Sequence, residues 1–171
     1  MSSSGGIQNQ LKDKLGHYFG DVLLEWSISS NSNDAFRHGA GLYEPRLDIA
    51  VGPFNTNLED GTPNLLEHFA SESPDSLKDF VHTKHLRENI NPRCLIAIEV
   101  VCSGSNKHIL GDIANSSLMG LYGFVVTNQK NLEIAKRILS YIRMAQAVGK
   151  APTELFKNVA VLSYEEMVNL L

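Results

Sequence analysis

Asp48 and Glu99 are the residues best suited to bind an ion or to catalyse a reaction, because their carboxylates interrupt apolar segments of the sequence. Glu99 interrupts the run Leu95–Val101, whose other six residues are apolar, and Asp48 takes a similar place in Leu47–Val51. A continuous β-branched run is typical of a strand buried on both faces of a sheet. An ionised carboxylate there loses several kcal/mol of hydration unless a cation or hydrogen bonds replace the water. We therefore predict that Asp48 and Glu99 lie on neighbouring strands and share a cation.

The ligand atoms predict which cation this would be. Carboxylate oxygens and the carbonyl of Val100 favour Mg²⁺, for which Mn²⁺ can substitute. An ion held by so few protein ligands keeps several waters, one of which can act as a nucleophile, and it can neutralise a phosphate. The structural alternative is a salt bridge from each acid to an arginine such as Arg46 or Arg37. Both interpretations stay open at this point.

The elements that must position these acids begin with a helix and a hairpin. Apolar residues at helical spacing predict a first helix from Ile7, and the same stripe extends to Trp26. Two strand-like segments, Phe36–Tyr43 and Arg46–Val51, follow and predict an antiparallel hairpin. The interrupted, polar region 55–92 then predicts a helical insertion, with helices over 64–70 and 75–88.

The second half of the chain alternates strands and helices. The predicted elements are strands over 95–101, 121–126 and 159–162, helices over 107–118 and 131–147, and a last helix capped by Ser163. This alternation implies parallel pairing with right-handed crossovers. Together with the antiparallel first half, it predicts an α/β fold with a mixed central β-sheet flanked by helices.

Length and composition bound the class of protein. A chain of 171 residues suits one domain, here 7–171 after a flexible N-terminal tail over 1–6. A net charge of -4 argues against a general polyanion-binding surface but allows a local basic cleft. Cys94 and Cys102 lie roughly 26 Å apart along an extended strand, too far for a disulfide, and reduced thiols fit a cytoplasmic protein. No apolar segment is long enough to predict a membrane span.

The segments Pro45–Asp48 and Ile98–Val101 resemble the motif of the PD-(D/E)XK nuclease superfamily. The topological likeness covers about residues 7–126, with the first acid on the second strand and the next acid on the third. This resemblance implies a restriction-endonuclease-like fold, Mg²⁺ held by Asp48 and Glu99, and hydrolysis of phosphodiester bonds in nucleic acid, with DNA as the expected substrate. It also allows a homodimer in which two sites address two strands.

The chain departs from this motif at one position. The superfamily places a lysine two residues after the second acid, where this chain has Val101. Such a lysine orients water or stabilises developing charge. Lys107, in the first turn of the next helix, is the candidate replacement, although a lysine there is also typical of a solvated helix start. Without a replacement, the chain would be a catalytically inactive nuclease-fold module that binds nucleic acid or protein.

The turn after the central strand predicts a phosphate contact. Its candidate residues are Ser103, Ser105, Lys107 and His108, because a Gly/Ser turn before a helix exposes backbone N–H groups at the positive end of the helix dipole. The turn lacks the spacing of a P-loop, so it is no nucleotide fingerprint. Nucleotide binding between Ser103 and Lys107 nevertheless stays a third hypothesis.

Three further acids are candidate accessory residues. Asp112 shares one helical face with His108 and Asn115, of which we expect Asn115 to face solvent. Glu44 precedes Asp48 by four positions, and Glu25 is expected near the end of the first helix, which would approach the site. The polarity of a turn explains Glu44 equally well.

Overall fold

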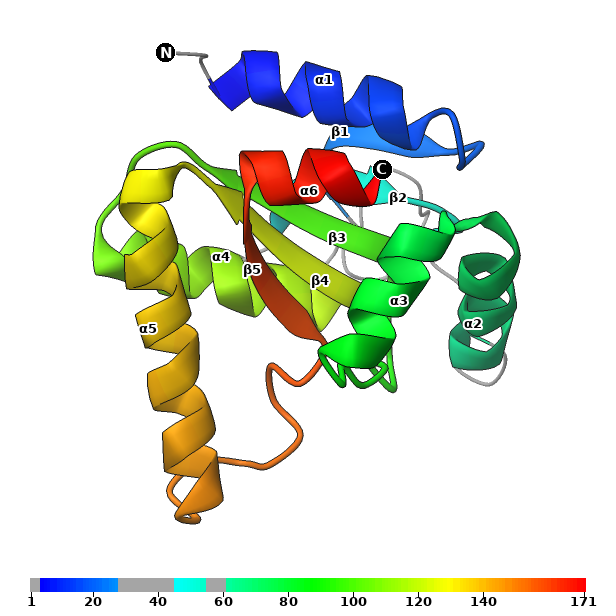
Figure 1. The fold of residues 1–171 in the computed structure, drawn as a ribbon. Coiled ribbons are helices and arrows are strands. Elements are labelled where there is room, and N and C mark those ends of the chain that lie inside the picture. Colours follow the sequence, from blue (N-terminus) through cyan, green and yellow to red (C-terminus); the bar gives the residue numbers. More distant parts are fainter. Residues whose placement is uncertain (1–3, 28–44, 55–60) are drawn as a thin grey trace, which may run out of the picture.

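The protein folds into a five-stranded mixed sheet with helices on both faces (Figure 1). This arrangement confirms the predicted α/β architecture. The computed structural model describes residues 4–27, 45–54 and 61–171. In chain order the elements are α1 (Ser4–Leu15), β1 (Val22–Ser27), β2 (Arg46–Val51), α2 (Gly61–Glu72), α3 (Asp75–Thr83), β3 (Cys94–Val101), α4 (Asn106–Met119), β4 (Gly120–Thr127), α5 (Gln129–Ala147), β5 (Val159–Ser163) and α6 (Tyr164–Leu170).

The sheet combines an antiparallel and a parallel half. Its order is β1-β2-β3-β4-β5, with β2 antiparallel to both β1 and β3, and with β4 parallel to both β3 and β5. Parallel neighbours need crossover connections, and α4 and α5 provide them. All residues of β3 and β4 are buried, as expected of strands that are covered on both faces.

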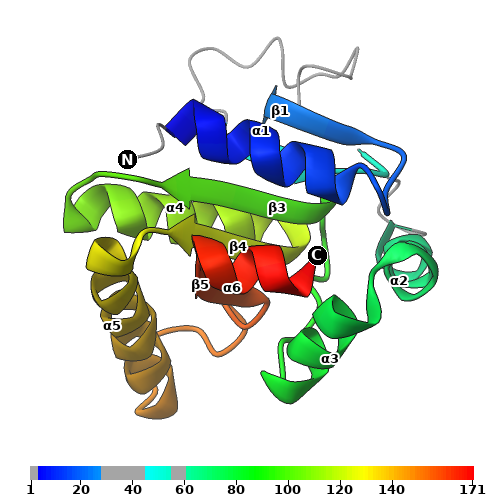
Figure 2. The ribbon, with the colours of Figure 1, turned by 45° about the horizontal axis from the view of Figure 1, so that its top comes forward.

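The helices form two layers around this sheet (Figure 2). Helices α4 and α5 cover one face, where Ile109, Ile113 and Leu132 pack against Val125 and Val161. Helices α1, α2, α3 and α6 supply apolar side chains to the other face, in a cluster that contains Leu11, Leu65, Leu77, Ile98, Phe124 and Met167. The central strand β3 therefore lies between two apolar layers, as the composition of its sequence predicts.

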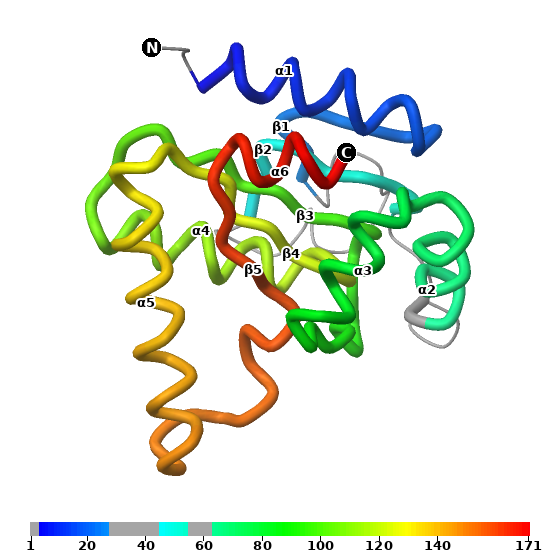
Figure 3. Tube along the Cα trace, in the orientation of Figure 1, coloured from blue at the N-terminus to red at the C-terminus, as the bar shows by residue number. Residues whose placement is uncertain are grey.

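The two ends of the described chain meet on one face of the sheet. Helices α1 and α6 lie side by side although most of the chain separates them (Figure 3). The Tyr164 hydroxyl donates to Gln10 Oε1 at 2.6 Å, and the Tyr18 hydroxyl donates to the Leu171 carbonyl at 2.9 Å. The predicted cap of α6 is confirmed, because Ser163 and Glu166 form a capping box.

The N-terminal segment differs from the prediction in two ways. Helix α1 begins at Ser4, so residues 4–6 belong to it instead of a flexible tail. Residues 22–27 form β1 and do not continue the helix, because Val22, Leu24 and Trp26 alternate with exposed Leu23 and Glu25 and pair with β2. The predicted hairpin partner of β2, residues 36–43, lies outside the described residues.

Two further expectations concern the absence of a disulfide and the absence of a membrane span. Both thiols are free; Cys94 is buried, whereas Cys102 is only partly so. Burial raises the pKa of the Cys94 thiol, which keeps it protonated. Within the described ranges, none of the helices has the length and apolar character needed to cross a bilayer.

Candidate active site

The two predicted acids meet where β2 and β3 separate. The antiparallel ladder between these strands ends with the pair Ile49 and Ile98, while β3 continues to Val101 beside β4. Extending the register by one residue sets Asp48 opposite Glu99. The main chain of Asp48 contacts the Glu99 carboxylate, so the predicted neighbourhood of these acids is present.

Carboxylates replace backbone partners at this point of the sheet. The Val100 N–H donates to Asp48 Oδ2 at 2.6 Å, and the Asp48 N–H donates to Glu99 Oε2 at 3.3 Å. Each bond links one strand to a side chain of the other. The two bonds satisfy main-chain donors beyond the end of the ladder and hold both acids in place.

Helix α4 adds Asp112 and Asn115 to the two strand acids. The helix packs on the sheet through Ile109 and Ile113, and this orientation turns Asn115 toward β3. Asn115 Nδ2 donates to Glu99 Oε1 at 3.2 Å. The expectation that Asn115 faces solvent is therefore wrong, and its spacing from Asp112 is the signal that could have identified it.

Burial and the charges of neighbouring carboxylates raise the pKa of all three acids. Glu99 is only 4% exposed, and burial, followed by the charges of Asp48 and Asp112, raises its pKa to about 8. Burial and then the charge of Asp48 raise the pKa of Asp112 to about 6. Burial also raises the pKa of Asp48, against the lowering effect of the Val100 N–H. The charge of Asp48 thus disfavours the ionised forms of both Glu99 and Asp112, and a bound cation would favour them.

The arginine predicted as a structural partner pairs elsewhere. Arg46 Nε lies 2.9 Å from Glu25 Oε2, in an exposed ion pair on the β1–β2 surface. Arg46 lowers the pKa of Asp48 only as the last of several influences, and His108 lowers that of Asp112. Arg37 lies outside the described residues. The Arg46 alternative therefore does not account for the half-buried position of Asp48.

Gln8 of α1 is a site residue that the sequence analysis missed. Its side chain is buried and hydrogen-bonds Asp48, which lowers the pKa of that acid. Gln8 shares the helical stripe of the buried residues Leu11 and Leu15. A polar residue on an apolar stripe is the signal that could have pointed to it.

The donor set fits a hard cation. Asp48, Glu99 and the nearby Asn115 and Gln8 offer oxygens, the ligands that Mg²⁺ and Mn²⁺ prefer. In a strand, the N–H and C=O of one residue point to the same side, so the carbonyl of Val100 faces the acids as its N–H does. In the described part of the chain, no group of three His, Cys, Asp or Glu residues is arranged as a complete ligand set. Water or substrate would have to complete the coordination.

The predicted phosphate segment lies at the start of α4, on the surface. Ser103, Ser105, Lys107 and His108 are all exposed. Ser105 and His108 cap the helix reciprocally: the His108 N–H donates to Ser105 Oγ at 3.5 Å and the Ser105 N–H donates to His108 Nδ1 at 3.4 Å. Among the described contacts, none joins Lys107 to a carboxylate of the site.

The remaining predicted positions fall into three environments. Val101, which stands at the position of the superfamily's lysine, is 4% exposed and packs with the apolar residues of α4 and α5. Glu25 lies on β1 instead of the first helix, is bound to Arg46, and raises the pKa of Asp48 through its charge. Glu44 lies outside the described residues.

Comparisons with known proteins give no relative from which a function could be inferred. No protein-family model matches the chain, and neither the curated proteins nor the solved structures include a match. The function must therefore be inferred from the residues of this chain and from their geometry.

Proposed function

We propose that this protein is a metal-dependent nuclease-like domain that hydrolyses phosphodiester bonds, with DNA as substrate. The observation that carries the proposal is the meeting of Asp48 and Glu99 where β2 and β3 separate, with neither acid paired to an arginine among the described residues. The resemblance to the PD-(D/E)XK superfamily supports it, since the first acid lies on the second strand and the next on the third.

A divalent cation is the partner that this arrangement favours. Mg²⁺ or Mn²⁺ held by Asp48, Glu99 and the Val100 carbonyl would supply a water of lowered pKa and neutralise phosphate charge. The mutual repulsion of the acids would be relieved, because a cation favours their ionised forms.

The residues of the chain itself would fix the geometry. Asn115 and the Asp48 N–H hold the two oxygens of Glu99, while Gln8 and the Val100 N–H hold Asp48. Lys107, at the exposed start of α4, would screen a phosphate, assisted by the positive end of the helix dipole. Such positioning groups matter because small displacements of reacting atoms cost large factors in rate.

The direct test is cleavage of supercoiled plasmid and short duplexes in Mg²⁺ or Mn²⁺. We expect Asp48→Asn and Glu99→Gln each to lower the rate by about 100-fold or more. Glu133→Gln, at an exposed position of α5, is the matched control and should cleave as the wild type does. Cleavage that survives both site substitutions would reject the proposal.

A second candidate is a nuclease-fold module without catalysis, which binds nucleic acid or protein. The burial of Val101 and the exposed position of Lys107 favour it, since neither supplies a cation to the acids. Calorimetric titration with Mn²⁺ separates the candidates: the nuclease binds the ion in a manner that requires Asp48 and Glu99. The inactive module would bind a duplex without turnover and without dependence on the ion.

A further inference from the structure

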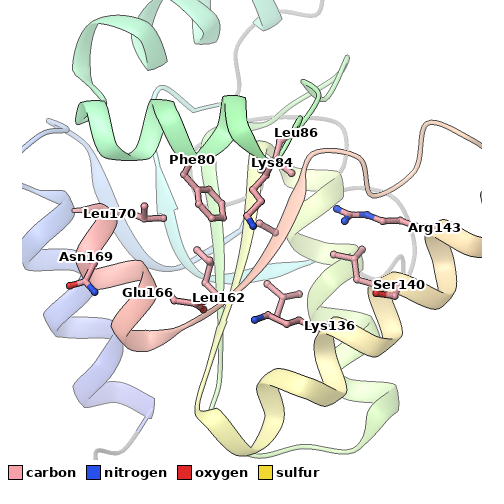
Figure 4. A pocket seen from close by; sticks show the side chains of 13 residues that line it. Phe80, Lys84, Leu86, Lys136, Ser140, Arg143, Leu162, Glu166, Asn169 and Leu170 are labelled. Carbon is pink, nitrogen blue, oxygen red and sulfur yellow. The ribbon is translucent and has the colours of Figure 1, made fainter.

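The free edge of the sheet opens onto a pocket that the carboxylate site does not use. Among the strands that the structure describes, β5 is the last of the sheet and pairs only with β4. A pocket of about 580 Å³ lies along it, between α3, α5 and α6 (Figure 4). This volume is typical of ligand-binding clefts.

Some backbone N–H and C=O groups of β5 point to the side of the strand that lies away from β4. The Gly123 N–H donates to the Asn158 carbonyl at 2.9 Å, which fixes the side of the strand that faces β4. Groups on successive residues of a strand alternate in direction, so those of Val159, Val161 and Ser163 face away from β4. The strand thus presents a donor and acceptor row at its outer edge.

Side chains occupy the two ends of that row. Arg143 Nη2 donates to the Val159 carbonyl at 3.3 Å, and Glu166 Oε2 accepts the Ser163 N–H at 2.6 Å. The N–H and C=O of Val161 lie between these two bonds. Among the described residues, no hydrogen bond to this outward pair is present, and Val161 lines the pocket.

The pocket has a different character on each side of the edge. Toward α3, Phe80, Leu86 and Leu162 form an apolar wall (Figure 4). Toward α5, Lys136 and Arg143 add positive charge beside Leu139, which packs on the opposite face of the sheet. A strand added to β5 would therefore meet an apolar surface with alternate side chains and a basic surface with the others.

Charge argues for an acidic occupant. Lys84, Lys136 and Arg143 line the pocket, and Glu166 is its one carboxylate among the described lining residues. Glu166 already accepts the Ser163 N–H, whereas Lys136 is exposed and makes no ion pair within the described chain. The excess positive charge attracts anionic side chains and repels a second copy of the same edge.

We propose that β5 binds an extended acidic segment of a partner protein by strand addition, with backbone bonds to Val161, apolar side chains against Phe80 and Leu162, and carboxylates against Lys136 and Arg143. Strand addition uses an exposed sheet edge for affinity and pockets for alternate side chains for specificity. The proposal does not rest on nuclease activity, because the pocket and the carboxylates lie at different strands of the sheet.

The test uses the full chain and an array of pentapeptides, acetylated and amidated at their ends. The second and fourth residues are glutamate, and the others vary among valine, isoleucine, leucine, phenylalanine and tyrosine. We expect a subset to bind and to shift the backbone amide resonance of Val161. Peptides of the same composition with both glutamates adjacent are the control, because they break the alternation, and they should not bind.

Two substitutions on α5 test whether the positive charge of the pocket contributes to peptide binding. Lys136→Glu reverses a lining residue and should weaken peptide binding by roughly tenfold or more. Arg137→Glu is the matched control, since Arg137 is exposed on the same helix but does not line the pocket. It should bind the peptides within about twofold of the wild type, as expected for a charge change outside the contact.

Methylation of single peptide amides tests the backbone bonds. Methylating the amide that faces β5 should abolish binding, whereas methylating the next amide should leave it unchanged, because only alternate amides face the strand. The proposal is overturned if no array peptide binds or if neither methylation matters. It is equally overturned if hexanoate displaces the peptides completely, which indicates a site for small amphipathic anions, or if the chain alone dimerises through β5.

Discussion

Asn115 holds the buried carboxylate of Glu99 from across the helix–sheet interface, its Nδ2 donating to Oε1 at 3.2 Å. This bond joins the first helix after β3 to the strand that carries the acid. It stabilises the ionised form of Glu99, against burial and the charges of Asp48 and Asp112. Asn115 is thus a positioning residue, and its removal has a consequence that a purely structural role would not produce.

Removing the Asn115 amide should weaken divalent-ion binding. Under the proposed function, we expect Asn115→Ala to lower the Mn²⁺ affinity by about 10- to 100-fold, the loss typical when a residue that orients a metal ligand is removed. Calorimetric titration measures the change. Asn106→Ala, at the exposed start of the same helix, is the control and should bind Mn²⁺ normally. Equal affinities in all three proteins would show that Asn115 does not orient Glu99 for an ion.

Without divalent ions, the protein should lose stability as the pH rises. The pKa of Glu99 is about 8 in the folded chain against an ordinary value of 4.5, so the folded state binds the proton more tightly between these values. The contribution of Glu99 to the free energy of unfolding is therefore fully present below pH 4.5, and it is lost as the pH rises toward about 8. Melting temperatures in EDTA across this range measure the effect.

Glu99→Gln supplies the control for this pH dependence. Glutamine cannot ionise, so we expect a flatter stability profile, with the remaining slope caused by Asp112, whose pKa is about 6, and by Asp48, whose pKa is also raised. Saturating Mg²⁺ should flatten the wild-type profile as well, because the ion stabilises the charged form. A wild-type profile that rises with pH in EDTA would contradict the electrostatics described for this site.

Lys107 should act on substrate binding more than on the chemical step. Because it contacts none of the three carboxylates, we expect Lys107→Ala to raise KM for DNA, with kcat within about twofold and a smaller effect at high salt. Lys150→Ala, at an exposed position far along the chain, is the matched control. A fall of about 100-fold in kcat would instead identify Lys107 as the relocated catalytic lysine.

Asn158 should be a major source of stability at the start of β5. Its Nδ2 donates to the carbonyls of Ser117 at 2.9 Å and Gly120 at 3.1 Å, and its Oδ1 accepts the Ser117 hydroxyl at 2.7 Å. We expect Asn158→Ala to lower the free energy of unfolding by about 2–4 kcal/mol, because buried partners are left unsatisfied. Urea denaturation measures this loss. Ser117→Ala removes one bond only and should cost less.

Part of this protein could be predicted from local patterns alone. The apolar run around Glu99 predicted β3, and helical spacing predicted α4 and α5 to within a few residues. The cap at Ser163 was also predictable, since it depends on a residue three positions away. These features follow from interactions between near neighbours in the chain, which the order of residues contains directly.

Other features depended on contacts between distant residues. Residues 22–27 fit a helical stripe as well as an alternating strand, and only pairing with β2 decides for β1. The orientation of α4 on the sheet decides that Asn115 faces Glu99. Local composition was enough to predict that Asp48 and Glu99 are acids within apolar strands, because it depends on adjacent residues only. Which neighbours those acids have, and which strand edge stays open, was decided only by tertiary structure, because packing joins segments that no local pattern relates.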